Sequence, residues 1–134
     1  MPRLNTFTMK FAPIPVMVAA IFFMVVGCSS GDITSPNQIA FPADSVSYAR
    51  QVEPYFTLAC NGPGCHNATD MAGGIDLSSW IGVRAINVTT PHDTTSELVL
   101  VMKGQLVHNA GFPAPTANQI EGITQWVREG AKDN

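Results

Sequence analysis

The chain has 134 residues with a formal net charge of −3 at pH 7, enough for one domain but not for two of typical size. The negative charge excludes a nucleic-acid-binding protein that relies on a basic surface. Three cysteines and three histidines are available for metal, cofactor or redox chemistry.

Residues 1–27 have the pattern of a secretory signal peptide. The first ten residues contain Arg3 and Lys10 and no acidic residue, and an uncharged apolar run then extends to Gly27. The most apolar part, residues 14–26, is short for a transmembrane helix. We therefore expect export, with an uncleaved membrane anchor as the alternative.

The sequence "VVGC" at the end of this segment resembles the lipobox of bacterial lipoproteins. The resemblance implies cleavage before Cys28 and acylation of that cysteine, and more than one attached chain gives stable membrane attachment. Ser29 and Ser30 follow in place of an aspartate, a pattern typical of outer-membrane sorting, so the protein would face the periplasm or the cell surface. Loss of Arg3 and Lys10 leaves five basic against ten acidic residues, a formal charge of −5.

Residues 28–44 are rich in Ser, Pro, Asp and Gly and show little apolar periodicity. This composition predicts a flexible tether from a lipidated Cys28. Extended at ~3.3 Å per residue, it would reach roughly 50 Å. We expect the folded domain to occupy residues 45–134.

Short helices and long loops are expected in that domain. Pro54 predicts a helix over residues 54–60 and disfavours a helical Glu53, whereas residues 45–51 are ambiguous. The Gly-rich stretch 61–76 predicts a loop. A second short helix begins at Ser78 or Ser79.

The last two elements are more regular. The stretch "TTSELVLVMKG" predicts a helix that ends at Gly104, although its apolar run also fits a strand. Thr116 and Gln119 have the spacing of a capping box, and apolar residues then recur at helical spacing: Ile120, Ile123 and Val127. The chain is therefore predicted to be all-α, with three or four short helices. So few apolar residues make a thin core, which favours a disulfide, a metal or a large apolar cofactor.

The stretch "CNGPGCHNA" can be interpreted in several ways. A Cys60–Cys65 disulfide is the simplest, but it leaves His66 unexplained. A zinc site needs two more ligands, for which His92 and His108 are available, but no second close pair of ligands is present. A thioredoxin-like motif would need C-x-x-C near a βαβ pattern, and the sequence contains neither.

Covalent haem explains more of this stretch. In the c-type signature C-x-x-C-H, two thiols form thioethers to the haem and the adjacent histidine binds iron. Here the spacer has four residues, and haem proteins with this longer spacing are a known variant. The cofactor would be one haem c per chain.

Several motifs in the same order resemble a family of small bacterial cytochrome c domains, often found as lipoproteins. They are "VEPYF", the cysteines ending in "GCH", "GGIDL", "SELVLVMKG" and the closing "QWVREGA", which together span about residues 46–132. The resemblance implies a cytochrome c-like fold with helices around one haem. It assigns Cys60 and Cys65 to the thioethers and His66 to the proximal iron ligand. Trp126 would line the haem, with a plain core role as the alternative.

The sequence departs from this family at the sixth iron ligand. The family's Met-Pro pair reads "GFPAP" here, so Phe112 stands where a methionine is expected. The candidates are His108 first, Met102 second, and Met71 in the loop after the attachment site; an open iron site is the alternative. His92 lies in a Pro-Asp turn and is expected to be exposed.

These features predict a lipid-anchored, single-haem electron carrier of the periplasm or outer membrane. Its partners would be redox proteins and, through the lipid anchor, a membrane; no nucleic acid and no catalytic residues are expected. Two alternatives stay open. One is a haem-free structural lipoprotein with a Cys60–Cys65 disulfide, and the other is a haem sensor or peroxidase-like protein with an open iron.

Overall fold

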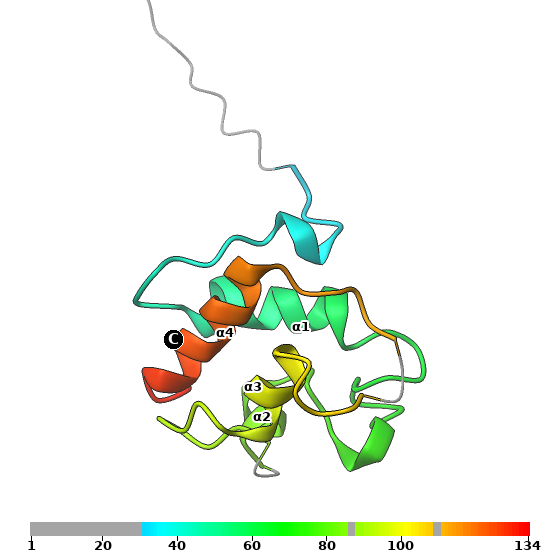
Figure 1. The fold of residues 1–134 in the computed structure, drawn as a ribbon. Helices are drawn as coiled ribbons and strands as arrows, with labels where there is room; N and C mark the ends of the chain where they lie inside the picture. Colours follow the sequence, from blue (N-terminus) through cyan, green and yellow to red (C-terminus); the bar gives the residue numbers. More distant parts are fainter. Residues whose placement is uncertain (1–30, 86–87, 109–110) are drawn as a thin grey trace, which may run out of the picture. The chain divides into compact units, whose positions relative to one another are not determined.

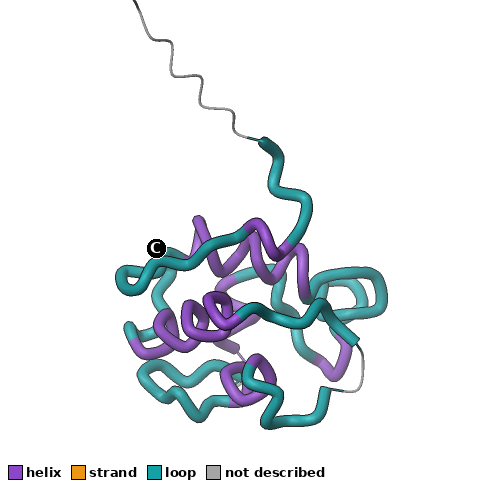
Figure 2. The backbone as a smooth tube through the Cα atoms, turned by 45° about the horizontal axis from the view of Figure 1, so that its top comes forward, coloured by secondary structure: helices purple, strands orange, loops and turns teal. Residues whose placement is uncertain are grey.

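The computed structural model describes residues 31–85, 88–108 and 111–134. Over these residues the protein consists of helices and loops without a strand (Figure 2), which confirms the all-α expectation for the described part. The elements are η1 (Pro36–Gln38), η2 (Tyr48–Val52), α1 (Glu53–Ala59), η3 (Ala72–Gly74), α2 (Trp80–Ala85), α3 (Glu97–Met102) and α4 (Ala117–Arg128). The expected signal peptide 1–27 and Cys28 lie outside the described residues.

Helix α4 begins with the capping box read from the sequence. The Thr116 hydroxyl accepts the Gln119 backbone N–H at 3.3 Å, and the Gln119 amide oxygen accepts the Thr116 N–H at 2.9 Å. The apolar run of α3 is helical, so the strand alternative for that segment is wrong. Helix α2 starts at Trp80, just after the two serines expected to begin it.

Pro54 does not begin a new helix, which corrects the expected start. Glu53 is helical, because the π-helical turn η2 runs into α1 without a break. In that turn the Glu53 N–H donates to the carbonyl of Tyr48, five residues back. The wider turn leaves space for the proline ring, which would clash with the preceding turn of a regular α-helix.

The folded domain begins before Ser45, so the tether is shorter than expected. Ile39 and Phe41 are buried in the core. The Phe41 backbone is bonded in both directions to the Asn118 side chain, at 2.8 and 2.9 Å. Phe41 also needs Gly122, since a Cβ there would lie 2.1 Å from the aromatic ring. Two large apolar side chains in a polar segment are enough to dock it.

Aromatic side chains dominate the core between the N-terminal segment, α1 and α4. Trp126, Tyr55 and Phe56 are almost completely buried, and the Trp126 ring lies 5.7 Å from that of Tyr48. Helix α3 contacts α4, and α1 contacts both η1 and η2 (Figure 1). This frame fixes the end of α1, from which the candidate site begins.

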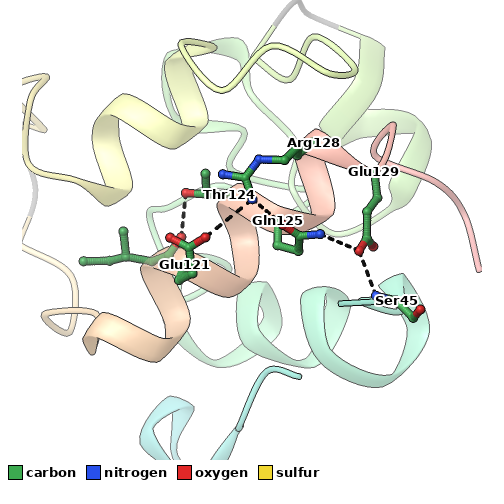
Figure 3. A network of polar contacts seen from close by, with 7 residues as sticks. Ser45, Glu121, Thr124, Gln125, Arg128 and Glu129 are labelled. Carbon is green, nitrogen blue, oxygen red and sulfur yellow. Dashed lines mark hydrogen bonds and ion pairs between the residues drawn. The ribbon is translucent and has the colours of Figure 1, made fainter. Parts of the chain in front are cut away.

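Polar side chains at the C-terminal end of α4, with Glu129 just after it, connect this end to the segment before η2 (Figure 3). The Glu129 carboxylate accepts the backbone N–H of Ser45 and the side-chain amide of Gln125, both at 2.7 Å. Arg128 contacts Gln125 and pairs with Glu121 at 3.5 Å, but this ion pair is exposed and contributes little. The bond from Ser45 thus holds the two segments together near η2.

Candidate functional site

Cys60 lies at the C-terminal end of α1, where its backbone N–H donates to the Phe56 carbonyl at 2.8 Å. Asn61 donates to the same carbonyl at 3.0 Å. The helix therefore fixes the first cysteine directly. Cys60 and Cys65 are both free thiols, with no disulfide between them in this structure.

The four-residue spacer folds into a tight turn. The Cys65 N–H donates to the Gly62 carbonyl at 3.0 Å, and Gly64 has a φ of 74°. Proline followed by a residue with positive φ is the pattern of a type II β-turn, in which glycine is favoured at that position. The turn brings the chain back so that the His66 N–H reaches the Cys60 carbonyl at 3.0 Å.

His66 and His108 face each other through their Nε2 atoms, 3.4 Å apart. His66 is held by its backbone, whose carbonyl accepts the Leu77 N–H at 2.7 Å. His108 comes from the segment after α3 and stacks edge-on against Phe112, with ring centroids 5.1 Å apart. The loop after α1 and the segment after α3 thus meet at this pair. The two imidazoles can share one N–H···N bond.

A cavity of about 310 Å³ surrounds the two histidines. Its wall is mostly apolar and includes Leu58, Leu77, Leu98, Val101, Phe112 and Pro113. Both cysteines line it, as do His66, His108 and Met102, while Glu97 is the acidic residue among the described lining residues. Apolar walls with a few convergent polar groups are typical of cofactor and small-molecule sites.

Two features of the site depend on burial. Burial, with a smaller contribution from Cys65, raises the pKa of the Cys60 thiol to about 12. The thiol is therefore protonated at neutral pH and is a poor nucleophile by itself. His66 Nδ1 is also buried, and it has no hydrogen-bond partner among the described residues.

Of the eight residues weighed for the site, the structure brings five together and places three elsewhere. Cys60, Cys65, His66, His108 and Met102 share the cavity. Met71 is exposed and His92 is exposed as expected, with its Nδ1 2.8 Å from the Arg128 carbonyl oxygen. Trp126 is absent from the cavity wall: it packs on Tyr48 in the core and donates to the Lys132 carbonyl, which favours the core alternative.

Met102 differs from His108 in its surroundings. Its side chain is buried, and its sulfur accepts a weak hydrogen bond from the Tyr55 hydroxyl at 3.9 Å. The thioether is thus engaged on the core side of the cavity. His108 instead presents Nε2 to the position opposite His66.

The sequence reading missed two residues that organise the loop, Asn67 and Asp70. Asn67 donates to the Gly62 carbonyl at 2.9 Å, and Asp70 accepts the Gly64 N–H at 2.7 Å. Asn and Asp are common turn formers because their side chains bond nearby backbone groups. Their spacing directly after the histidine was the available signal.

Within the described ranges, no group of three or more His, Cys, Asp or Glu side chains is arranged to hold a metal ion by protein ligands alone. Among the same residues, the helices are too short or too polar to cross a membrane.

Comparison with known proteins does not assign a family: no protein-family model, no curated protein and no solved structure matches the chain.

Proposed function

We propose that this chain is a lipid-anchored c-type cytochrome that carries single electrons on one covalently attached haem. The observation that carries the proposal is the meeting of His66 and His108 through their Nε2 atoms in an apolar cavity that both Cys60 and Cys65 line. The order of motifs that resembles small bacterial cytochrome c domains supports the same assignment.

The distance between the two histidines is slightly shorter than one metal ion between them would need. Metal–imidazole nitrogen bonds are about 2.0 Å long, so two opposed ligands need about 4 Å between their nitrogens. The observed separation is 3.4 Å. A small outward movement of the His108 segment would therefore admit a metal, and a more open hollow of about 450 Å³ also borders His108 and Phe112.

The donor set also fits haem c. Two thiols and two imidazoles are the groups that covalent attachment and six-coordinate iron require. When bound, the haem supplies one-electron transfer at iron. Leu58, Leu98 and Phe112 then exclude water, and the two histidines orient the cofactor. Ligation by two histidines rather than by Met and His gives a lower reduction potential.

A reduced-state absorption spectrum tests the proposal. The full chain would be produced in a host with a cytochrome c maturation system, and haem would be sought on the denatured polypeptide. Covalent haem with a six-coordinate spectrum is the expected result. A denatured chain without haem and with a Cys60–Cys65 disulfide would overturn the proposal in favour of a structural lipoprotein. Carbon monoxide binding by the untouched protein would instead identify an open iron and a sensor or peroxidase-like role.

The anchor is tested separately at Cys28. We expect the exported protein to lie in the outer-membrane fraction and to incorporate labelled fatty acid. The Cys28→Ala variant should lose both properties, because it lacks the acylated sulfur. An unlabelled wild-type protein that still sediments with membranes would favour the uncleaved apolar segment as the anchor.

A further inference from the structure

The spacer turn is held from one side by a pair of polar residues. The side-chain amide nitrogen of Asn67 donates to the Gly62 carbonyl at 2.9 Å and to Asp70 Oδ2 at 2.7 Å. The same Oδ2 accepts the Gly64 N–H at 2.7 Å. Asn67 and Asp70 therefore reach both Gly62 and Gly64, the two residues on either side of Pro63.

The pair is itself fixed in place. Asn67 Oδ1 accepts the backbone N–H groups of Thr69 and Asp70, both at 2.9 Å. The Asn67 amide and, secondly, the Gly64 N–H hold the pKa of the Asp70 carboxyl below its usual value. The carboxylate is thus ionised at neutral pH, and its bonds to the two N–H donors are charge-assisted, which makes them stronger than neutral ones.

We propose that Asn67 and Asp70 are positioning residues that hold the four-residue spacer in the turn that presents Cys65 and His66 to the cavity. The need follows from the length of the spacer. A longer spacer between two attachment points has more conformations to lose than a shorter one, so it gains more from an external restraint. As a statement about haem attachment this inference rests on the proposed function, while the restraint on the loop is independent of it.

The restraint acts where the turn is otherwise weakest. Gly62, Pro63 and Gly64 include the two glycines of the spacer, and Gly64 occupies a left-handed conformation. Within the turn, the Cys65 thiol lies 3.7 Å from the Pro63 carbonyl oxygen, a weak contact. Without the two side chains, the spacer would depend on two backbone bonds, from the Cys65 N–H to Gly62 and from the His66 N–H to Cys60.

The chain offers a matched control at Asp93. Its carboxylate also accepts two local donors, the Thr95 N–H at 2.8 Å and the Thr95 hydroxyl at 2.6 Å. Like Asp70 it is exposed and its pKa is lowered by those bonds. It lies in the loop before α3, outside the cavity wall. Asp93→Ala therefore removes a comparable turn restraint away from the site.

The first experiment counts thioethers in the haem-loaded full chain. After denaturation and alkylation, the tryptic peptide 51–84 contains Cys60 and Cys65 and reports which sulfurs were free. Wild type and Asp93→Ala should carry haem on both cysteines. Asp70→Ala and Asn67→Ala should raise the fraction of chains with a free Cys65 about tenfold, and Asp70→Asn, which keeps a neutral acceptor, should be intermediate. Equal thioether counts in all variants would overturn the inference and leave the cytochrome assignment intact.

The second experiment uses haem-free protein and decides the matter even if no haem is attached. Amide exchange at Gly64 and alkylation of the Cys65 thiol should both speed up about tenfold in Asp70→Ala, while Asp93→Ala should change neither. A wild-type chain without haem would contradict the proposed function. The rates of Gly64 exchange and Cys65 alkylation would still test whether Asn67 and Asp70 hold the spacer. Unchanged rates at both positions, or a common loss of thermal stability in both variants with no change at Gly64, would show that Asn67 and Asp70 do not position the spacer.

Discussion

The loop that carries Cys60, Cys65 and His66 is fixed largely by its own neighbours, whereas the segment that carries His108 is placed by contacts between distant parts of the chain. In the loop, the backbone groups of Cys60, Cys65 and His66 all take part in hydrogen bonds between residues 60 and 77. His108 meets the His66 ring, 42 positions earlier in the sequence, in addition to the nearby ring of Phe112. The loop with Cys60, Cys65 and His66 should therefore keep its shape without a cofactor, while the segment with His108 should adjust to what fills the cavity.

Removal of the two thiols should have the largest effect. In the Cys60→Ala/Cys65→Ala variant, we expect complete loss of haem from the denatured chain, because no thioether can form. Staining for haem after denaturing electrophoresis measures this directly. Met71→Ala, a change at an exposed residue of the same loop, should retain wild-type haem. Haem retained by the double variant would mean that attachment occurs elsewhere.

The segment that carries His108 is tested by His108→Ala. This variant should keep covalent haem but lose the six-coordinate spectrum and gain carbon monoxide binding, since the loop with His66 is independently held. His108→Met should raise the reduction potential above that of wild type. Met102→Leu is the control and should leave the spectrum unchanged. A spectral change at Met102 with none at His108 would exchange their roles.

Substitution of one exposed glycine in each segment tests how strongly the backbone conformation is constrained there. Alanine at Gly64 meets no neighbouring atom but must adopt a φ of 74°, which costs about 1 kcal/mol. Alanine at Gly111, before Phe112, also meets nothing and has no left-handed φ to adopt, so it should be neutral or slightly stabilising. Urea unfolding of the haem-free chains measures both. Equal destabilisation would remove the distinction between the two segments.

The last prediction concerns pH. Because the pKa of Cys60 is raised to about 12 from 9.0, the folded state binds this proton more tightly than the unfolded state. Its contribution to stability is complete below pH 9 and is lost as the pH rises toward 12. The free energy of unfolding of the haem-free protein should therefore fall between pH 8 and 10.5 more steeply in wild type than in Cys60→Ala. Parallel curves would show that Cys60 is not protected from solvent.

Local patterns were the part of the fold that could be predicted from sequence. The capping box at Thr116 and the helix that ends before Gly104 depend on residues only a few positions apart. The early start at Glu53 could not be foreseen, because a π-turn upstream changes what Pro54 tolerates. The docking of Phe41 depends on space left by Gly122, 81 positions later, which no local pattern reports.

The candidate site divides in the same way. Cys60, Cys65 and His66 lie within seven residues of one another, so their grouping could be predicted from the sequence alone. The sequence already ranked His108 before Met102 as the proposed sixth ligand, and the contact of the Tyr55 hydroxyl with the Met102 sulfur is the tertiary information that supports this order. The core position of Trp126 required such tertiary information, since helical spacing alone does not tell a cavity wall from a core.

The docking of the segment around Pro36 bears on where the protein can work. The Pro36 carbonyl already accepts a bond from Gln119 at 2.6 Å, so the first tie to the domain lies eight residues after Cys28. With Cys28 as the proposed anchor, those residues span at most about 26 Å when fully extended. This short linker would hold the domain close to the lipid headgroups. Its electron donor and acceptor would then have to approach along the membrane surface. A variant with a longer linker between Cys28 and Pro36 would be able to reach partners farther from the membrane.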